Sequence, residues 1–158
     1  MQEIDGQIVI LDLVKRNFIQ YFLASIKLNN PRRSFMSKIL IVDDDTDFVE
    51  AVRIVLEKNG YDVFAAHSRE EGMQSVQDNH PDMMILDVMM DSPDDGFTMA
   101  HDIRKGGFDK PILMLSSVSK VTGMNFDKNS DLVPVNIFEE KPIHPEKLLS
   151  QVKELLSA

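Results

Sequence analysis

The sequence predicts an α/β protein with a doubly wound, five-stranded parallel sheet flanked by helices. Short apolar runs alternate with segments of helical periodicity from residue 38 onward, an order typical of strand–helix–strand units. The apolar runs are nearly continuous, as in parallel strands that helices cover on both faces. With 158 residues, 43% of them hydrophobic, the chain can bury one such core.

Five strands are predicted, because five short apolar runs lie between polar or turn-forming residues. They cover residues 38–42, 61–65, 82–86, 111–115 and 134–138. Right-handed crossovers would place helices on both faces of the sheet. The carboxyl ends of the strands would then share one edge, where α/β proteins bind their ligands.

Four helices are predicted from apolar periodicity combined with start and stop signals. They cover residues 46–58, a segment that opens at Ser68, residues 96–105 and a segment that opens at Pro145. Ser68 and Glu71 have the spacing of a capping box, and Pro145 suits the first turn of a helix. Strands and helices thus alternate from the first strand to the fourth, and the fifth strand is followed by the last helix.

Residues 1–35 precede this domain and are separated from it by the polar, Pro-containing stretch 29–34. Residues 8–28 are rich in apolar side chains, but their longest uncharged run, residues 17–26, is too short to span a bilayer. The acidic start and the missing cleavage site argue against a signal peptide. Two interpretations stay open: a hydrophobic helical extension that needs a partner surface, or an upstream extension from a mis-called start, since Met36 lies just before the first strand.

Composition excludes several kinds of site. The sequence has no Cys, which rules out a disulfide framework, a thiolate zinc site and a cysteine nucleophile. The net charge of −9 disfavours direct binding to nucleic acid or to anionic lipid. The sequence also lacks a glycine-rich phosphate loop and a nucleotide-binding fingerprint.

Polar and charged side chains follow four of the predicted strands. They are Asp43 and Asp44 after the first strand, Asp87 after the third, Ser116 after the fourth and Lys141 beyond the fifth. Carboxylates placed this close repel one another unless a cation lies among them, and oxygen ligands without His or Cys suit Mg²⁺. Three carboxylates, one Mg²⁺ and one ammonium balance in charge, which leaves a site able to accept a phosphoryl group. The simpler interpretation of an acid after a strand is a helix cap, which we expect of Asp45 or Thr46.

Four stretches resemble the signature motifs of the response-regulator receiver domain of two-component signalling, a chemotaxis-regulator-like domain. They read ILIVDDD at 39–45, PDMMILDVMM at 81–90, PILMLSS at 111–117 and EKPI at 140–143. The motifs come in family order within residues 36–158, and the resemblance implies the flavodoxin-like receiver fold. The family's fourth helix would fall in residues 119–133, but turn formers and a missing helical period there predict a short, displaced or mobile helix.

The resemblance implies a Mg²⁺-dependent phosphoacceptor. Asp87 would take a phosphoryl group from the phosphohistidine of a histidine kinase. Asp44 would bind Mg²⁺ directly and Asp43 through water, and the backbone carbonyl of Met89 would supply a further oxygen. Lys141 would pair with Asp87 and then with the phosphoryl oxygens. The transfer would be self-catalysed, with slow autodephosphorylation at most, rather than the turnover of an enzyme.

Two further positions imply a switch. Ser116 would donate its hydroxyl to the bound phosphoryl group, and Phe138, at the family's aromatic switch position, would turn inward. Ordinary packing is the alternative for Phe138. Met89 and Val118 occupy positions that influence attack by water in the family, and both are apolar, so the phosphoryl group is expected to last minutes or more.

We expect a cytoplasmic, single-domain regulator, because the sequence ends at Ala158, directly after its last predicted helix. The short uncharged run and the net charge lead us to expect neither a transmembrane segment nor direct contact with nucleic acid. Its signal would pass to a downstream target protein or to a histidine phosphotransfer protein. Two alternatives stay open. One is a phosphorylation-independent interaction module with the same fold. The other is an aspartate-based phosphohydrolase, which expects a second Asp two residues after the nucleophile, where Met89 stands.

Overall fold

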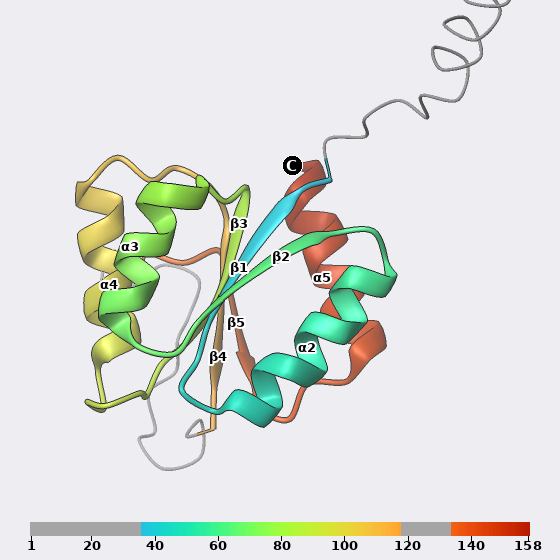
Figure 1. Ribbon diagram of the computed structural model, residues 1–158, viewed down its shortest axis with the longest axis horizontal. Coiled ribbons are helices and arrows are strands. Elements are labelled where there is room, and N and C mark those ends of the chain that lie inside the picture. The colour runs from blue at the N-terminus through green and yellow to red at the C-terminus, as the bar shows by residue number, and fades with distance from the viewer. Residues whose placement is uncertain (1–35, 118–133) are drawn as a thin grey trace, which may run out of the picture. The chain divides into compact units, whose positions relative to one another are not determined.

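The computed structural model describes residues 36–117 and 134–158, which form one parallel sheet flanked by helices (Figure 1). The strands are β1 (Lys38–Val42), β2 (Asp62–Ala66), β3 (Met83–Asp87), β4 (Ile112–Ser116) and β5 (Ile137–Glu140). They lie in the order β2-β1-β3-β4-β5, and every pair of neighbours is parallel. The order therefore reverses between β1 and β3, the kind of position where α/β proteins bind ligands. The predicted doubly wound fold class is confirmed.

Helices cover both faces of the sheet (Figure 1). They are α2 (Thr46–Lys58), α3 (Arg69–Asn79), α4 (Asp95–Lys105) and α5 (Pro145–Ser157). α2 and α5 lie on one face, and α3 and α4 lie on the other. The start signals act as predicted: the Asp45 carboxylate accepts hydrogen bonds from two N–H groups in the first turn of α2, and Ser68 Oγ accepts one from the N–H of Glu71.

Alternate residues of each strand enter two separate apolar layers. In β1, Ile39 and Ile41 belong to the layer under α2 and α5, whereas Leu40 and Val42 belong to the layer under α3 and α4. Every residue of β3 and β4 is buried. Because both faces of the sheet are covered, both sides of each central strand must be apolar, which explains the nearly continuous apolar runs in the sequence.

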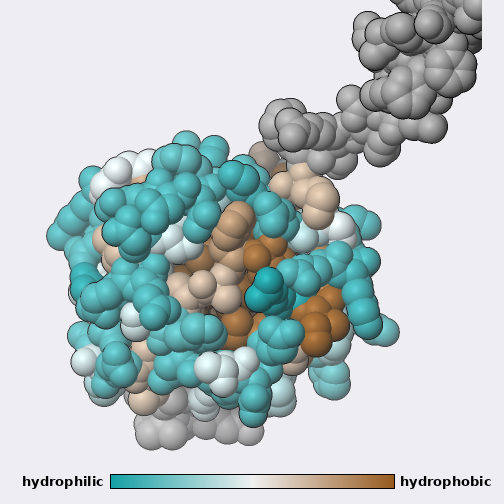
Figure 2. All heavy atoms as spheres, in the orientation of Figure 1, coloured by the Kyte–Doolittle hydropathy of each residue, from teal (hydrophilic) through white to brown (hydrophobic). Residues whose placement is uncertain are grey.

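Hydrophilic residues make up most of the surface of this unit in Figure 2. Hydrophobic residues reach the surface between α3 and α2, along the edge strand β2. Among residues 36–117 and 134–158, the exposed large hydrophobic side chains are those of Met36, Ile54 and Met89. No helix in these two ranges is long and apolar enough to cross a bilayer.

The fifth strand starts later than predicted, at Ile137 instead of residue 134. The residues before it bind elsewhere: Asn136 Oδ1 accepts a hydrogen bond from the backbone N–H of Ile112 at 2.8 Å. The carbonyl of Pro134 accepts one from Arg104 Nε at 3.0 Å. The strand also ends later, at Glu140, so Lys141 follows β5 directly instead of lying three residues beyond the end predicted at residue 138.

Three other strands each run one residue later than predicted. Because the ladder continues through the pairs Asp87–Leu115 and Ser116–Glu140, Asp87 ends β3 and Ser116 ends β4. Both side chains thus come from the last residue of a strand rather than from the following loop. The predicted N-terminal extension, residues 1–35, and the predicted irregular fourth helix, residues 119–133, lie outside the described residues.

Candidate functional site

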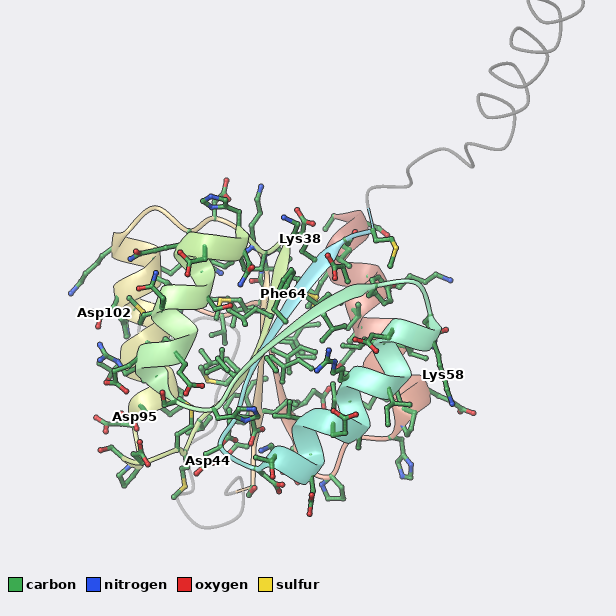
Figure 3. All side chains as sticks on the ribbon, viewed as in Figure 1. Lys38, Asp44, Lys58, Phe64, Asp95 and Asp102 are labelled. Carbon is green, nitrogen blue, oxygen red and sulfur yellow. The ribbon has the colours of Figure 1, made fainter. Side chains whose placement is uncertain are left out.

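Three carboxylates meet at the carboxyl edge of the sheet, where the strand order reverses. Asp43 and Asp44 follow β1, and Asp87 ends the neighbouring strand β3. One carboxylate oxygen from each residue lies within 4.8 Å of the other two. We call Asp43, Asp44 and Asp87 the carboxylate cluster. Figure 3 shows Asp44 at this edge, far from Lys38 at the start of β1.

The carboxylate cluster combines buried and exposed charge. Asp43 and Asp87 are only 1% and 5% exposed, whereas Asp44 is exposed. The backbone holds Asp43 from two sides: its N–H donates to the carbonyl of Ala66 at 3.1 Å, and its Oδ1 accepts from the N–H of Asp45 at 3.0 Å. Solvent and ligands therefore reach the cluster from the side of Asp44.

Lys141 supplies a positive charge to the carboxylate cluster. Its Nζ lies 2.5 Å from Asp43 Oδ2 and 3.1 Å from Asp87 Oδ1. Its backbone N–H donates to the carbonyl of Ser116 at 2.8 Å, which holds the residue after β5 against the end of β4. One ammonium thus faces three carboxylates, and this group of four side chains carries an excess of negative charge.

Burial and mutual repulsion set the protonation of these groups. Burial raises the pKa of Asp87 to about 6; the charges of Asp43 and Asp44 add to the rise, and Lys141 opposes it. Burial also raises the pKa of Asp43 against the hydrogen bond from Lys141. Burial alone would lower the pKa of Lys141, but its hydrogen bond with Asp43 and the charges of the two buried carboxylates outweigh that effect, so this pKa is raised. Lys141 therefore stays positively charged. A second cation would stabilise the charged forms of the buried carboxylates.

The donor set fits a hard divalent cation. The carboxylate cluster offers three oxygen ligands from neighbouring strand ends and no His or Cys. Two of the carboxylates are buried and have raised pKa values, so a dication would offset much of the unfavourable free energy of burying their charge. Oxygen ligands and a solvent-accessible side suit Mg²⁺, which keeps several of its waters when it binds.

The other predicted site residues lie around the cluster in different settings. Ser116 is buried at the end of β4, next to Lys141 along the backbone hydrogen bond. Met89, two residues after Asp87, has a side chain that is 39% exposed. Phe138 is half-buried in β5, opposite Met114, and packs against the apolar layer under α3 and α4. Val118 lies outside the described residues.

Three residues that the sequence did not assign to the site support it. A Cβ on Gly96 would lie 2.0 Å from the carbonyl oxygen of Asp87, so only glycine lets α4 start against the end of β3. His67 Nδ1 lies 3.2 Å from the carbonyl oxygen of Asp43. The Phe48 ring lies under Lys141, with Nζ 4.4 Å from its centre. Of these three residues, only Gly96 could have been noticed in the sequence, because a glycine in the first turn of a helix can mark a close backbone approach.

Comparisons with known proteins agree with this geometry. Residues 39–153 match the family model of the response regulator receiver domain. The chain is 33% identical over 120 residues to the alkaline phosphatase synthesis transcriptional regulatory protein PhoP of Bacillus subtilis, covering 75% of this chain and 48% of that protein. It is 37% identical over 123 residues to the response regulator MprA of Mycobacterium ulcerans, covering 75% and 50%.

Solved structures give the same result. The chemotaxis response regulator CheY4 of Vibrio cholerae is 29% identical, with a TM-score of 0.65 over 76% of this chain and 98% of that one. A response regulator structure from Chloroflexus aurantiacus is 32% identical, with a TM-score of 0.63 over 77% and 98%. The chain spans about half the length of the curated relatives named above, whereas it spans nearly all of these two solved chains.

Proposed function

This chain belongs to the response regulator receiver domain family, and from that premise we propose that it is a cytoplasmic, Mg²⁺-dependent phosphoacceptor. Residues 36–158 form the proposed receiver domain. Asp87 takes a phosphoryl group from the phosphohistidine of a histidine kinase. The contact that carries this proposal is the bridge of Lys141 Nζ between Asp43 and Asp87, at 2.5 and 3.1 Å, beside the exposed carboxylate of Asp44.

The proposed transfer is a single displacement at phosphorus. A carboxylate oxygen of Asp87 forms the new P–O bond while the P–N bond to the donor imidazole breaks, and the electron pair of that bond leaves with the imidazole nitrogen. Asp87 must be ionised to attack, and its pKa of about 6 leaves it ionised at neutral pH. Its position at the end of a fully buried strand supports attack along one direction.

Mg²⁺, when bound, would neutralise charge on the transferred oxygens. Asp44 would hold it directly, Asp43 through water, and the carbonyl of Met89 would add a further oxygen. The Lys141 ammonium lies 3.1 Å from the attacking carboxylate of Asp87. It would therefore be able to replace this contact with one to a phosphoryl oxygen as negative charge moves from the carboxylate to the phosphoryl group. Catalysis of this kind consists of positioning and charge neutralisation. It suits a protein that accepts one phosphoryl group on its own side chain and does not turn over.

The output of the proposed switch would run through β4 and β5. Ser116 would turn its hydroxyl toward the phosphoryl group, and Phe138, half-buried beside Met114, would move further inward. A downstream target protein or a histidine phosphotransfer protein would read this change. The net charge of −9 favours such a protein partner over nucleic acid.

Incubation with acetyl phosphate and Mg²⁺, followed by intact-mass measurement, tests the proposal. Wild-type protein should gain the mass of one phosphoryl group and keep it, whereas Asp87→Asn should gain none. Continuous release of phosphate would instead support a phosphohydrolase, and an unchanged mass in the wild type would support a phosphorylation-independent module. Asp102→Asn, a carboxylate of α4 that pairs with Arg69, is the matched control and should be phosphorylated normally.

A further inference from the structure

An aromatic ring lies against the cation of the proposed phosphorylation site. Lys141 Nζ is positioned over the ring of Phe48, 4.4 Å from its centre, well within the range of a cation–π contact. The same ammonium contacts the carboxylates of Asp43 and Asp87. Its three N–H donors thus have three neighbours: two carboxylates and one ring face.

The ring itself is held firmly. Phe48 lies in the first turn of α2, where its backbone N–H donates to the capping carboxylate of Asp45 at 3.0 Å. Its half-buried side chain packs against the apolar layer under α2 and α5. A cap and a packed core therefore fix the position of the ring, and the ring can in turn restrict a long, flexible lysine side chain.

We propose that Phe48 is a positioning residue that keeps the Lys141 ammonium within bonding distance of Asp87 while the charge at Asp87 changes. This inference rests on the proposed phosphoacceptor function. The carboxylates are variable partners, because a dication and a phosphoryl group both alter their charge during the reaction. The ring is a neutral partner whose attraction for the ammonium persists through these changes. It also covers one side of a lysine that is only 13% exposed, which limits competition from water.

The chain contains a second cation–π pair that serves as a control. Arg104, in the last turn of α4, lies 5.7 Å from the centre of the ring of Phe108, which follows that helix, away from the carboxylate cluster. Phe108, like Phe48, is half-buried and packs against an apolar layer. Replacing either phenylalanine by leucine removes one ring and one cation contact, but only the change at Phe48 reaches Lys141.

The test is the initial rate of Asp87 phosphorylation by acetyl phosphate at saturating Mg²⁺. Phe48→Leu should be about tenfold slower than wild type, equivalent to about 1.4 kcal/mol. Phe48→Tyr, which keeps the ring, should restore most of the rate, and Phe108→Leu should react at the wild-type rate. Urea unfolding of both leucine variants shows whether they lose similar stability, as a shared packing role requires.

A series of fluorinated phenylalanines at position 48 separates the cation–π contact from packing even if the leucine variant folds poorly. Fluorine withdraws electron density from the ring face and changes its volume little. The rate should fall stepwise with one, two and three fluorines, to about threefold below wild type. Equal rates across the series, or cyclohexylalanine at the wild-type rate, would overturn the proposal for Phe48. Failure of the wild type itself to accept a phosphoryl group on Asp87 would instead refute the proposed function.

Discussion

The amino edge and the carboxyl edge of the sheet each contain a cationic side chain, but the two cations contact different acceptors. At the amino edge, Arg104 donates to the carbonyls of Pro134, Phe108 and Lys110, all of them neutral acceptors. At the carboxyl edge, Lys141 contacts two buried carboxylates and lies beside a third. Both cations also contact a phenylalanine ring.

The difference lies in the acceptors. The neutral carbonyls at the amino edge are satisfied by hydrogen bonds from Arg104, so this contact carries no unbalanced charge. Carboxylates in excess of the available cations leave the carboxyl edge with unbalanced negative charge. Burial, with the charge of neighbouring carboxylates adding to it, raises the pKa values of Asp43 and Asp87. The proposed reactivity of the carboxyl edge, and the structural role we infer for the amino edge, both follow from what each cation contacts.

Replacing the cation of the carboxyl edge should have the largest effect on function. Lys141→Met removes the charge that faces Asp87 and keeps much of the side-chain length. We expect phosphorylation by acetyl phosphate to slow by about a hundredfold or more, the size seen when one oxyanion-stabilising donor is lost. Initial rates by intact mass provide the measurement. A rate within a few fold of wild type would show that the lysine does not stabilise the transfer.

The raised pKa of Asp87 predicts an unusual pH dependence of stability in Mg²⁺-free buffer. The folded-state pKa is about 6, against an ordinary value of 3.8, so between these values the folded chain holds the proton and the unfolded chain does not. The contribution of Asp87 to stability is therefore greatest at low pH and falls by about 3 kcal/mol as the pH rises from about 4 to 7.

Urea unfolding of wild type and Asp87→Asn at several pH values measures this contribution as a difference. Asp87→Asn should gain stability relative to wild type as the pH rises, and added Mg²⁺ should remove most of that gain by stabilising the wild type. A difference that stays constant between pH 4 and 7 would contradict the burial of an unbalanced charge at Asp87.

Replacing the cation of the amino edge should have the converse effect. Arg104→Met leaves three backbone carbonyls without their donor, so we expect the free energy of unfolding to fall by about 2 kcal/mol. The phosphorylation rate should stay within about twofold of wild type. Chemical unfolding and the acetyl phosphate assay test both parts. A large loss of rate in this variant would mean that the two edges are not independent.

The smallest expected effect concerns the lifetime of the phosphoryl group. Met89, two residues after Asp87, is 39% exposed, and its thioether cannot orient an attacking water as an amide can. The phosphoryl group should persist for minutes or more, and Met89→Asn should shorten its lifetime roughly tenfold. Met89→Leu, which stays apolar, should leave it unchanged. Radiolabel release at neutral pH measures all three, and loss within seconds from the wild type would refute the expectation.

The sequence predicted the sheet well because burial on both faces leaves a local trace in each strand. Asp43 and Asp87 could be placed at one edge for the same reason, since parallel strands end together. The late start of β5 could not be predicted, because it depends on Asn136 bonding to Ile112, a contact between residues 24 positions apart. The position of Phe48 under Lys141 depends on how α2 packs against the loop after β5. The sequence only places Phe48 within the helix predicted for residues 46–58.

The most direct test of the central claim uses phosphoramidate, whose P–N bond resembles that of phosphohistidine, with either Mg²⁺ or EDTA. Borohydride reduction followed by peptide mapping then locates any acyl phosphate along the chain. Our account predicts one modified position, Asp87, and only in the presence of Mg²⁺. Modification at another residue, or equal modification of Asp87 in EDTA, would contradict it.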